Sequence, residues 1–167
     1  LRAALTENLT PKALKVLKDT ASEISDRIIK ELVAQGEFDA VEDLACELPL
    51  NIVVDLIGVR DQYVRDNILN WGAAAFNVLG PMNARTGMNF PVAGELYGWC
   101  SQITQDKLEP GSIGYAIFEA AKRGEIPEDA PPHIIHQYVA AGLDTTVATI
   151  ANVIQMLGEN PEQYAML

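Results

Sequence analysis

One long helical stretch, predicted over 132–158, constrains the fold of this 167-residue chain more than any other feature of the sequence. Pro131 and Pro132 suit the first turn of a helix, and Gly158 suits its end. At about 1.5 Å per residue the helix would be roughly 40 Å long, enough to cross a whole domain. We therefore expect it at the centre of the fold, with other helices packed around it.

The remainder of the chain also carries apolar side chains three and four residues apart, which is the spacing of amphipathic helices. Pro49 lies inside one of these stretches, where we expect a kink or a broken start. No segment alternates apolar and polar residues over the length of a strand, so we predict a single all-α segment across 1–167. The predicted helices are 11–35, a helix that starts at Asp39 or Glu42 and ends at 57, 61–79, 93–108 and 113–123.

A connector is predicted over 80–91, because glycine, proline and asparagine are too dense there for a helix. Met82, Met88 and Phe90 lie within it. These adaptable apolar side chains suit a mobile cover over a binding site. A plain connector is the alternative, and the residues themselves leave both interpretations open.

The charge balance excludes two classes of partner. Twelve basic against 23 acidic side chains leave a formal net charge of −11. Nucleic acids and anionic membrane surfaces both require a positive face, so we expect neither as a partner. No stretch reaches the roughly 18 apolar residues of a membrane span. The chain starts without methionine and ends within a predicted helix, so we expect it to be the interior of a longer protein.

The centre of the long helix carries an unusual run, Ala-Ala-Gly-Leu-Asp-Thr-Thr, at 140–146. Gly142 costs about 1 kcal/mol relative to alanine in a helix, but small residues admit a large flat group or another backbone. Thr145 and Thr146 can bond to carbonyls one turn earlier and loosen the helix. Asp144 adds an ionisable group beside them. The alternative is a tight crossing of two helices, with Asp144 paired to an arginine.

The run at 141–146 matches the signature [AG]-G-x-[DE]-T-[TS] of the central I helix in the cytochrome P-450 family of haem-thiolate monooxygenases. The sequence Gly-Glu-Asn-Pro-Glu-Gln at 158–163 resembles the junction between helices I and J. Leu-Arg-Ala-Ala-Leu at 1–5 and Leu-Thr-Pro-Lys-Ala-Leu at 9–14 resemble the end of helix C and its continuation. The resemblance therefore implies a mainly α fold, the central helical part of this family from helix C to helix I. In it, 80–91 is the loop between helices F and G.

The resemblance implies haem (iron protoporphyrin) and O2 as cofactors, and insertion of one oxygen atom into a small organic substrate. Thr145 would hydrogen-bond the bound dioxygen, and Asp144 would gate proton delivery to it. Arg2 would bind a haem propionate, a role that suits a fixed guanidinium. Ala141 and Gly142 would belong to the haem site and leave room for dioxygen over the haem, and Gln137 and Ala140 would face the substrate. The resemblance also allows Phe76 and Trp71 to line the pocket, and the alternative is that these helical aromatic side chains belong to the core.

The same resemblance implies that electrons come from NAD(P)H through a ferredoxin or flavodoxin-type donor, and that the protein is cytoplasmic, as in soluble bacterial members. The family's axial cysteine lies in F-x-x-G-x-x-x-C-x-G, and neither Cys46 nor Cys100 has that context. The E-x-x-R motif is also absent from the chain. We therefore expect no metal-ligating residue here, and no activity from these residues by themselves.

Two other functions stay open from the sequence. One is a non-enzymatic, acidic, all-α binding module in which the run at 141–146 is only a helix crossing. The other is a metal protein based on His133 and His136, which share a helical face three residues apart. That spacing can bind a metal ion, but the sequence places no third ligand nearby.

Overall fold

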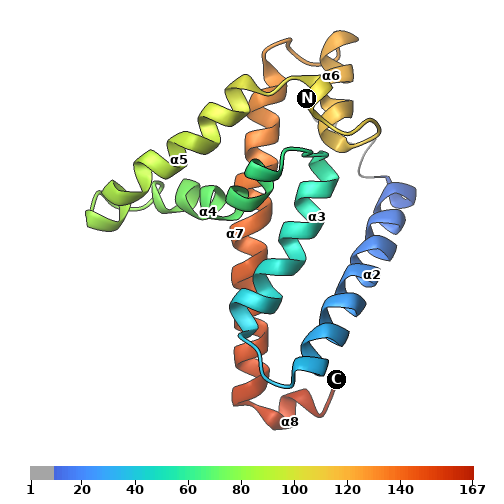
Figure 1. Ribbon diagram of the computed structural model, residues 1–167, viewed down its shortest axis with the longest axis vertical. Coiled ribbons are helices and arrows are strands. Elements are labelled where there is room, and N and C mark those ends of the chain that lie inside the picture. Colours follow the sequence, from blue (N-terminus) through green and yellow to red (C-terminus); the bar gives the residue numbers. More distant parts are fainter. Residues whose placement is uncertain (1–9) are drawn as a thin grey trace.

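A computed structural model of the chain describes residues 10–167 and is built from helices (Figure 1). The pairing of Val59 with Leu108 is an isolated bridge, and no strand occurs within residues 10–167. The predicted all-α class is therefore confirmed. The elements are α2 (Pro11–Gln35), the π-helical turn η2 (Ala40–Cys46), α3 (Glu47–Ile57), α4 (Gln62–Asn77), α5 (Ala84–Gln102), the 3-10 turn η3 (Gln105–Lys107), α6 (Ile113–Lys122), α7 (Ala130–Glu159) and α8 (Pro161–Tyr164).

The long helix α7 runs along the long axis of the molecule and contacts most other elements (Figure 1). Its range covers the stretch predicted over 132–158. Helix α3 lies along one side of α7, with α2 outside it, and α4 and α5 together form an arm that projects from the middle and upper part of α7. Helix α6 packs near the start of α7. This arrangement makes α7 the shared support of the other helices.

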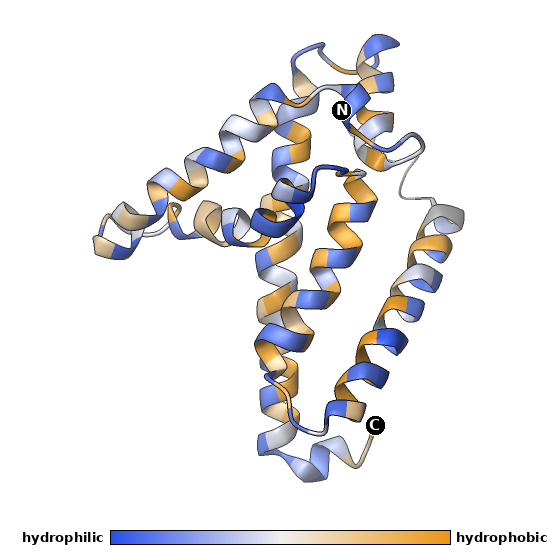
Figure 2. Cartoon of the chain, viewed as in Figure 1, coloured by the Kyte–Doolittle hydropathy of each residue, from blue (hydrophilic) through white to orange (hydrophobic). Residues whose placement is uncertain are grey.

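The core lies where α3, α4, α5 and α6 meet the first half of α7. Its side chains follow the three- and four-residue spacing of the predicted helices, and Figure 2 shows apolar stripes on α3 and on the side of α2 turned towards it. A contiguous cluster of buried apolar residues is the basis of stability in such a domain. Its most deeply buried members include Val54, Ile57, Ile68, Leu96, Ile135, Val139 and Leu143.

The chain between α2 and α3 has the broken start that Pro49 predicts. The Asp39 side chain accepts hydrogen bonds from the backbone N–H groups of Val41 (2.8 Å) and Glu42 (2.9 Å), and π-helix follows. The hydrogen-bond pattern changes to α-helical at Glu47, two residues before Pro49. Because proline has no N–H to donate, a change of pattern at this point avoids a lost hydrogen bond in a continuous helix.

The connector predicted over 80–91 is wrong in its length, because α5 already begins at Ala84. Asn83 caps the helix by accepting a hydrogen bond from the Thr86 N–H at 3.0 Å. Pro91 lies inside the helix, where it is exposed, and the Gly87 carbonyl that loses its donor also lies on an exposed turn. Water can satisfy that carbonyl, so the helix tolerates the proline.

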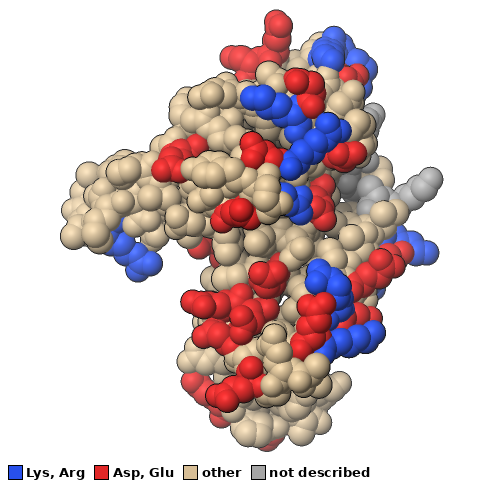
Figure 3. All heavy atoms as spheres, in the orientation of Figure 1, with Lys and Arg blue, Asp and Glu red and all other residues tan. Residues whose placement is uncertain are grey.

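The charged groups are unevenly spread over the surface. On the face shown in Figure 3, uncharged residues form most of the surface, acidic groups gather in several patches, and basic groups lie beside acidic ones. No helix within residues 10–167 combines the length and the apolar character needed to cross a bilayer.

Candidate functional site

The run at 140–146 lies halfway along α7, where the helix leaves the core. Leu143 is fully buried among the core residues. Ala141 and Thr145, four residues apart and therefore on one face of the helix, are both exposed. Half-buried Asp144 lies at the edge of the same face. The run therefore has a buried side that holds the helix and an open side that carries a hydroxyl and a carboxylate.

This open side is a stripe that follows α7 over several turns. Its exposed residues recur every three or four positions, and Ala141 and Ala148 are the small members on either side of Thr145. Small side chains at these positions leave the Thr145 hydroxyl accessible to a group larger than water. The exposed residues of the stripe are His133, Gln137, Ala141, Thr145, Ala148 and Asn152.

The threonines bond back to the helix as predicted. Thr145 Oγ1 donates to the Ala141 carbonyl at 2.6 Å, and Thr146 Oγ1 donates to the Gly142 carbonyl at 2.8 Å. Thr149 Oγ1 then donates to the Thr145 carbonyl at 2.7 Å. Successive bonds of this kind compete with the backbone ladder. A hydroxyl that donates inward also keeps its lone pairs free to accept a hydrogen bond from outside.

Gly142 is next to α3 and not on the open face. A Cβ atom added to it would lie 3.5 Å from Val53 Cγ2, which is ordinary van der Waals contact. Packing against α3 therefore does not require glycine at this position. The alternative of a tight helix crossing that demands glycine loses its main support.

The alternative of a tight helix crossing also predicts an arginine partner for Asp144, and no such partner is found among the described residues. The ion pairs within residues 10–167 are Arg27–Glu31, Arg60–Glu109, Arg65–Asp55, Lys122–Glu119 and Arg123–Glu125. None of them involves Asp144. Its carboxylate therefore lies at the edge of the stripe, and no other residue of 10–167 forms an ion pair with it.

The other predicted site residues lie at different depths. Gln137 is exposed on the stripe, whereas Ala140 is half-buried and packs against the core. Phe76 is half-buried on α4. Trp71, for which the sequence left a pocket and the core open, is 3% exposed and is a core residue. Arg2 lies outside the described residues.

Both cysteines have thiols with a raised pKa. Cys100 is buried in the core, and burial raises the pKa of its thiol to about 12. Burial, followed by the carboxylates of Glu42 and Glu47, raises the pKa of Cys46. Both thiols are therefore harder to deprotonate than a free cysteine. That the axial cysteine lies outside this chain stays a prediction from the sequence motif.

The histidine pair lies beside a small pocket of about 190 Å³ between α5 and α7. Burial, and secondly the proximity of His133, lower the pKa of His136, and the edge of the Tyr97 ring faces its imidazole at 6.4 Å. Nowhere in residues 10–167 do three His, Cys, Asp or Glu side chains gather to hold a metal ion. The structure therefore gives no support to a histidine-based metal site.

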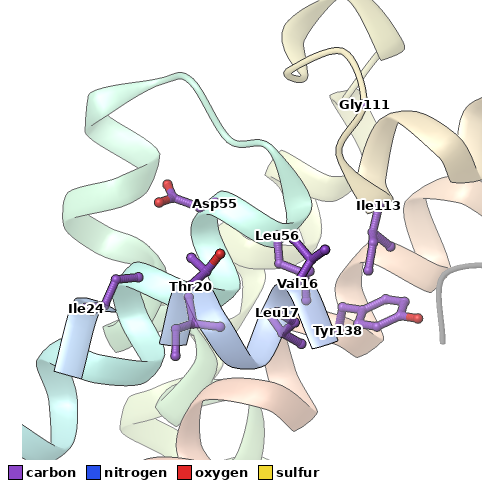
Figure 4. A pocket seen from close by; sticks show the side chains of 10 residues that line it. Val16, Leu17, Thr20, Ile24, Asp55, Leu56, Gly111, Ile113 and Tyr138 are labelled. Atoms are coloured by element: carbon purple, nitrogen blue, oxygen red, sulfur yellow. The ribbon is translucent and has the colours of Figure 1, made fainter. Parts of the chain in front are cut away.

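Sequence reasoning missed a groove of about 420 Å³ between α2, α3 and the segment that leads into α6 (Figure 4). Its walls are mainly apolar, and Tyr138 of α7 closes one end. The apolar stripe of α2 was visible in the sequence, but the sequence does not tell how closely α2 approaches α3. The groove is lined by Val16, Leu17, Thr20, Ile24, Ile52, Asp55, Leu56, Gly111, Ile113 and Tyr138.

No protein-family model matches the chain. Among curated proteins it is 33% identical to cytochrome p450 CYP199A2 of Rhodopseudomonas palustris, over 99% of this chain and 40% of that protein. It is 27% identical to the steroid C26-monooxygenase of Mycobacterium tuberculosis, over 99% of this chain and 39% of that protein. The chain thus spans about 40% of the length of the curated relatives that it matches.

Solved structures agree on the fold. The chain matches CYP109E1 from Bacillus megaterium, solved in complex with testosterone, with a TM-score of 0.83 at 22% identity. That match covers 99% of this chain and 45% of the other. It also matches CYP268A2 of Mycobacterium marinum, solved in complex with pseudoionone, with a TM-score of 0.76 over 100% of this chain and 42% of the other. The helices described above therefore form part of this known architecture.

Proposed function

The chain belongs to the cytochrome P-450 family, and from that premise we propose that it is part of a haem-dependent monooxygenase. The reaction would insert one atom of O2 into a small organic substrate and reduce the other atom to water. The observation that carries the proposal is the open stripe of α7, where the Thr145 hydroxyl and the Asp144 carboxylate lie beside small side chains.

The stripe fits one side of a haem. A flat macrocycle needs small side chains where it lies against a helix, and Ala141 supplies one on the exposed face. We propose that Ala141 and Thr145 lie against the haem and that Arg2 binds a propionate. The resemblance also assigns Gly142 to the haem, but this residue lies next to α3, beside the open face and not on it. The thiolate ligand of the haem would come from outside these residues, because neither Cys46 nor Cys100 lies in the motif F-x-x-G-x-x-x-C-x-G. Bound haem would supply the reductive activation of O2.

Thr145 is proposed to hold a proton at the site. Its hydroxyl donates to the Ala141 carbonyl at 2.6 Å and can accept a hydrogen bond with its free lone pairs. Rotation about its side-chain bond would turn the hydroxyl proton from that carbonyl towards the open side of the stripe. A hydroxyl that can switch between these two directions delivers a proton without admitting bulk water.

Asp144 is proposed to replace that proton. It is half-buried at the edge of the stripe and is not among the ion pairs between described residues. A carboxylate in this position can exchange protons with solvent on one side and with the neighbouring hydroxyl on the other. Thr145 and Asp144 are therefore the proposed catalytic residues.

Substrate contacts are proposed for three residues. Gln137 lies on the stripe one turn before Ala141, where its amide can orient a polar group of the substrate. Ala140 and Phe76 would supply apolar contacts. One relative is named a steroid C26-monooxygenase and one matching structure holds testosterone. A largely apolar organic substrate with a polar group fits these contacts.

The electrons are proposed to come from NAD(P)H through a ferredoxin or flavodoxin-type protein, with the reaction in the cytoplasm. The chain spans about 40% of its relatives, so the surface that binds the donor is assigned to no residue here.

The proposal is tested by comparing Thr145→Ala with Thr146→Ala in the full-length protein. Both threonines are exposed and both bond to a carbonyl four residues earlier, so the two changes cost the helix a similar amount. We expect Thr145→Ala to divert most electrons from product to hydrogen peroxide. Thr146→Ala should keep the ratio of product to hydrogen peroxide that the unchanged protein gives. Equal ratios in the two variants would refute the role of Thr145.

A further inference from the structure

Three aromatic side chains on the arm form a continuous chain of ring contacts between the core and the surface. Tyr63 and Trp71 of α4 meet edge to face, with ring centroids 6.0 Å apart and planes at 64°. Trp71 in turn lies 6.4 Å from Trp99 of α5, with planes at 39°. Both separations are within the range of direct aromatic contact.

The two ends of this chain differ from its middle in exposure. Trp71 is 3% exposed and lies in the core, whereas Tyr63 is 63% exposed. Trp99 is half-buried and lines a groove of about 380 Å³ together with Arg60 and Lys107. Core packing explains Trp71, but it does not explain why a largely exposed tyrosine should continue the chain to the solvent.

Trp71 also has a proton acceptor. Its indole Nε1–H donates to Glu95 Oε2 at 3.0 Å, and Glu95 is an exposed residue of α5. An indole that loses an electron becomes a much stronger acid at this nitrogen. A carboxylate at hydrogen-bond distance can therefore take the proton as the electron leaves, and the hydrogen bond returns it when the electron is restored.

We propose that Tyr63, Trp71 and Trp99 form a relay that carries one-electron oxidising equivalents from the protein interior to the surface, ending on Tyr63. Tryptophan and tyrosine are the aromatic side chains that lose a single electron most readily. Adjacent rings in contact allow the electron vacancy to move in short steps. At Tyr63 the vacancy would be open to small reductants in solution, such as thiols.

The steps balance in electrons and protons. A one-electron oxidant takes an electron from Trp71, directly or through Trp99, and the Trp71 N–H proton passes to Glu95. Tyr63 then gives an electron to Trp71, which recovers its proton from Glu95, and the Tyr63 phenol releases its own proton to solvent. The net result is one reduced oxidant, one tyrosyl radical and one released proton. A thiol then restores Tyr63 by giving it one hydrogen atom.

The relay rests on the proposed function only for its source of oxidant. The oxidant in the cell would be the activated haem of the monooxygenase when no substrate consumes its oxidising power. The relay would then protect the site from damage. Because the relay itself consists of residues of this chain, an external photo-oxidant can test it without monooxygenase activity.

The experiment attaches a ruthenium polypyridyl photo-oxidant at Lys107→Cys, in the groove beside Trp99, with Cys46 changed to alanine. Cys100 is buried and therefore protected from labelling. Flash oxidation is followed by transient absorption, and the radicals are identified by electron paramagnetic resonance. We expect a tryptophanyl signal that decays into a tyrosyl signal.

Three variants assign the path. Tyr63→Phe should abolish the tyrosyl signal and lengthen the life of the tryptophanyl radical, and Trp71→Phe should stop the vacancy at Trp99. Tyr164→Phe is the matched control, because Tyr164 is 66% exposed and lies on α8, and it should leave both signals unchanged. An undiminished tyrosyl signal in Tyr63→Phe would overturn the relay. Because Tyr63 is exposed, that variant keeps its fold even if Trp71→Phe does not.

A failure of the relay would leave the proposed function untouched, since the ratio of product to hydrogen peroxide in Thr145→Ala and in Thr146→Ala does not depend on Tyr63. The converse also holds: equal ratios in those two variants would refute the role of Thr145, while the photo-oxidant would still test the relay.

Discussion

The two halves of α7 have the same backbone conformation but opposite surroundings. In the first half, Ile135, Val139 and Leu143 are fully buried beneath the neighbouring helices. In the second half, Val153 is 50% exposed and Met156 is 63% exposed. Within residues 10–167, the first half of α7 therefore packs against the other helices, whereas the second half leaves hydroxyl, amide and apolar groups uncovered. The proposed site lies at the boundary between the buried half and the uncovered half of α7.

The largest expected effect comes from a core residue just before this boundary. Leu143→Ala leaves a cavity at a fully buried position and should lower the free energy of unfolding by about 2–5 kcal/mol. Val153→Ala, ten residues later on the exposed half, should change it by less than about 0.5 kcal/mol. Urea unfolding followed by circular dichroism measures both. A similar decrease in the free energy of unfolding in both variants would contradict the difference in packing between the two halves of α7.

A smaller effect of opposite sign is expected at Gly142. Alanine fits there, 3.5 Å from the Val53 side chain, and should raise the free energy of unfolding by up to about 1 kcal/mol through better helix propensity. Gly114→Ala is the control, because its new Cβ would collide with the Ile57 carbonyl and destabilise the protein. A large loss of stability in Gly142→Ala would show that packing, not the site, requires this glycine.

The smallest effect is a pH dependence at the start of the buried half. Burial and His133 lower the pKa of His136 below its ordinary value of 6.5. Because the unfolded chain binds the proton more readily, the stability from neutral His136 is complete above pH 6.5 and is lost as the pH falls through the folded pKa.

His136→Gln should flatten this part of the stability profile, whereas exposed His133→Gln should leave most of it. Urea midpoints measured between pH 5 and pH 8, a range about the ordinary histidine value, make the comparison. A parent profile that does not fall below pH 6.5 would contradict the assignment to His136.

Apolar spacing was enough to predict most helices, because the buried faces of α2, α4, α6 and α7 repeat every three or four residues. It failed at 80–91, where turn-forming residues lie inside α5: the Asn83 cap and the solvent exposure of Pro91 offset their low propensity. The back-bonding of Thr145 was also predictable, since it is local.

Other features depend on contacts between distant segments. The approach of Val53 to Gly142 and the contact of Trp71 with Trp99 join different helices, and no spacing rule gives the distance between helices. For Trp71 the sequence left a pocket and the core open, because a helical pattern does not tell which buried aromatic side chain lines a cavity, and the structure places it in the core. The roles of Asp144 and Thr145 stay predictions until they are measured.

The most direct test of the central claim, that α7 forms one side of a haem-thiolate site, is the optical spectrum of the full-length protein after reduction and binding of carbon monoxide. The account predicts the strongly red-shifted Soret band of a thiolate-ligated haem. A protein that binds no haem, or whose Soret band lies at the position typical of histidine ligation, would contradict it.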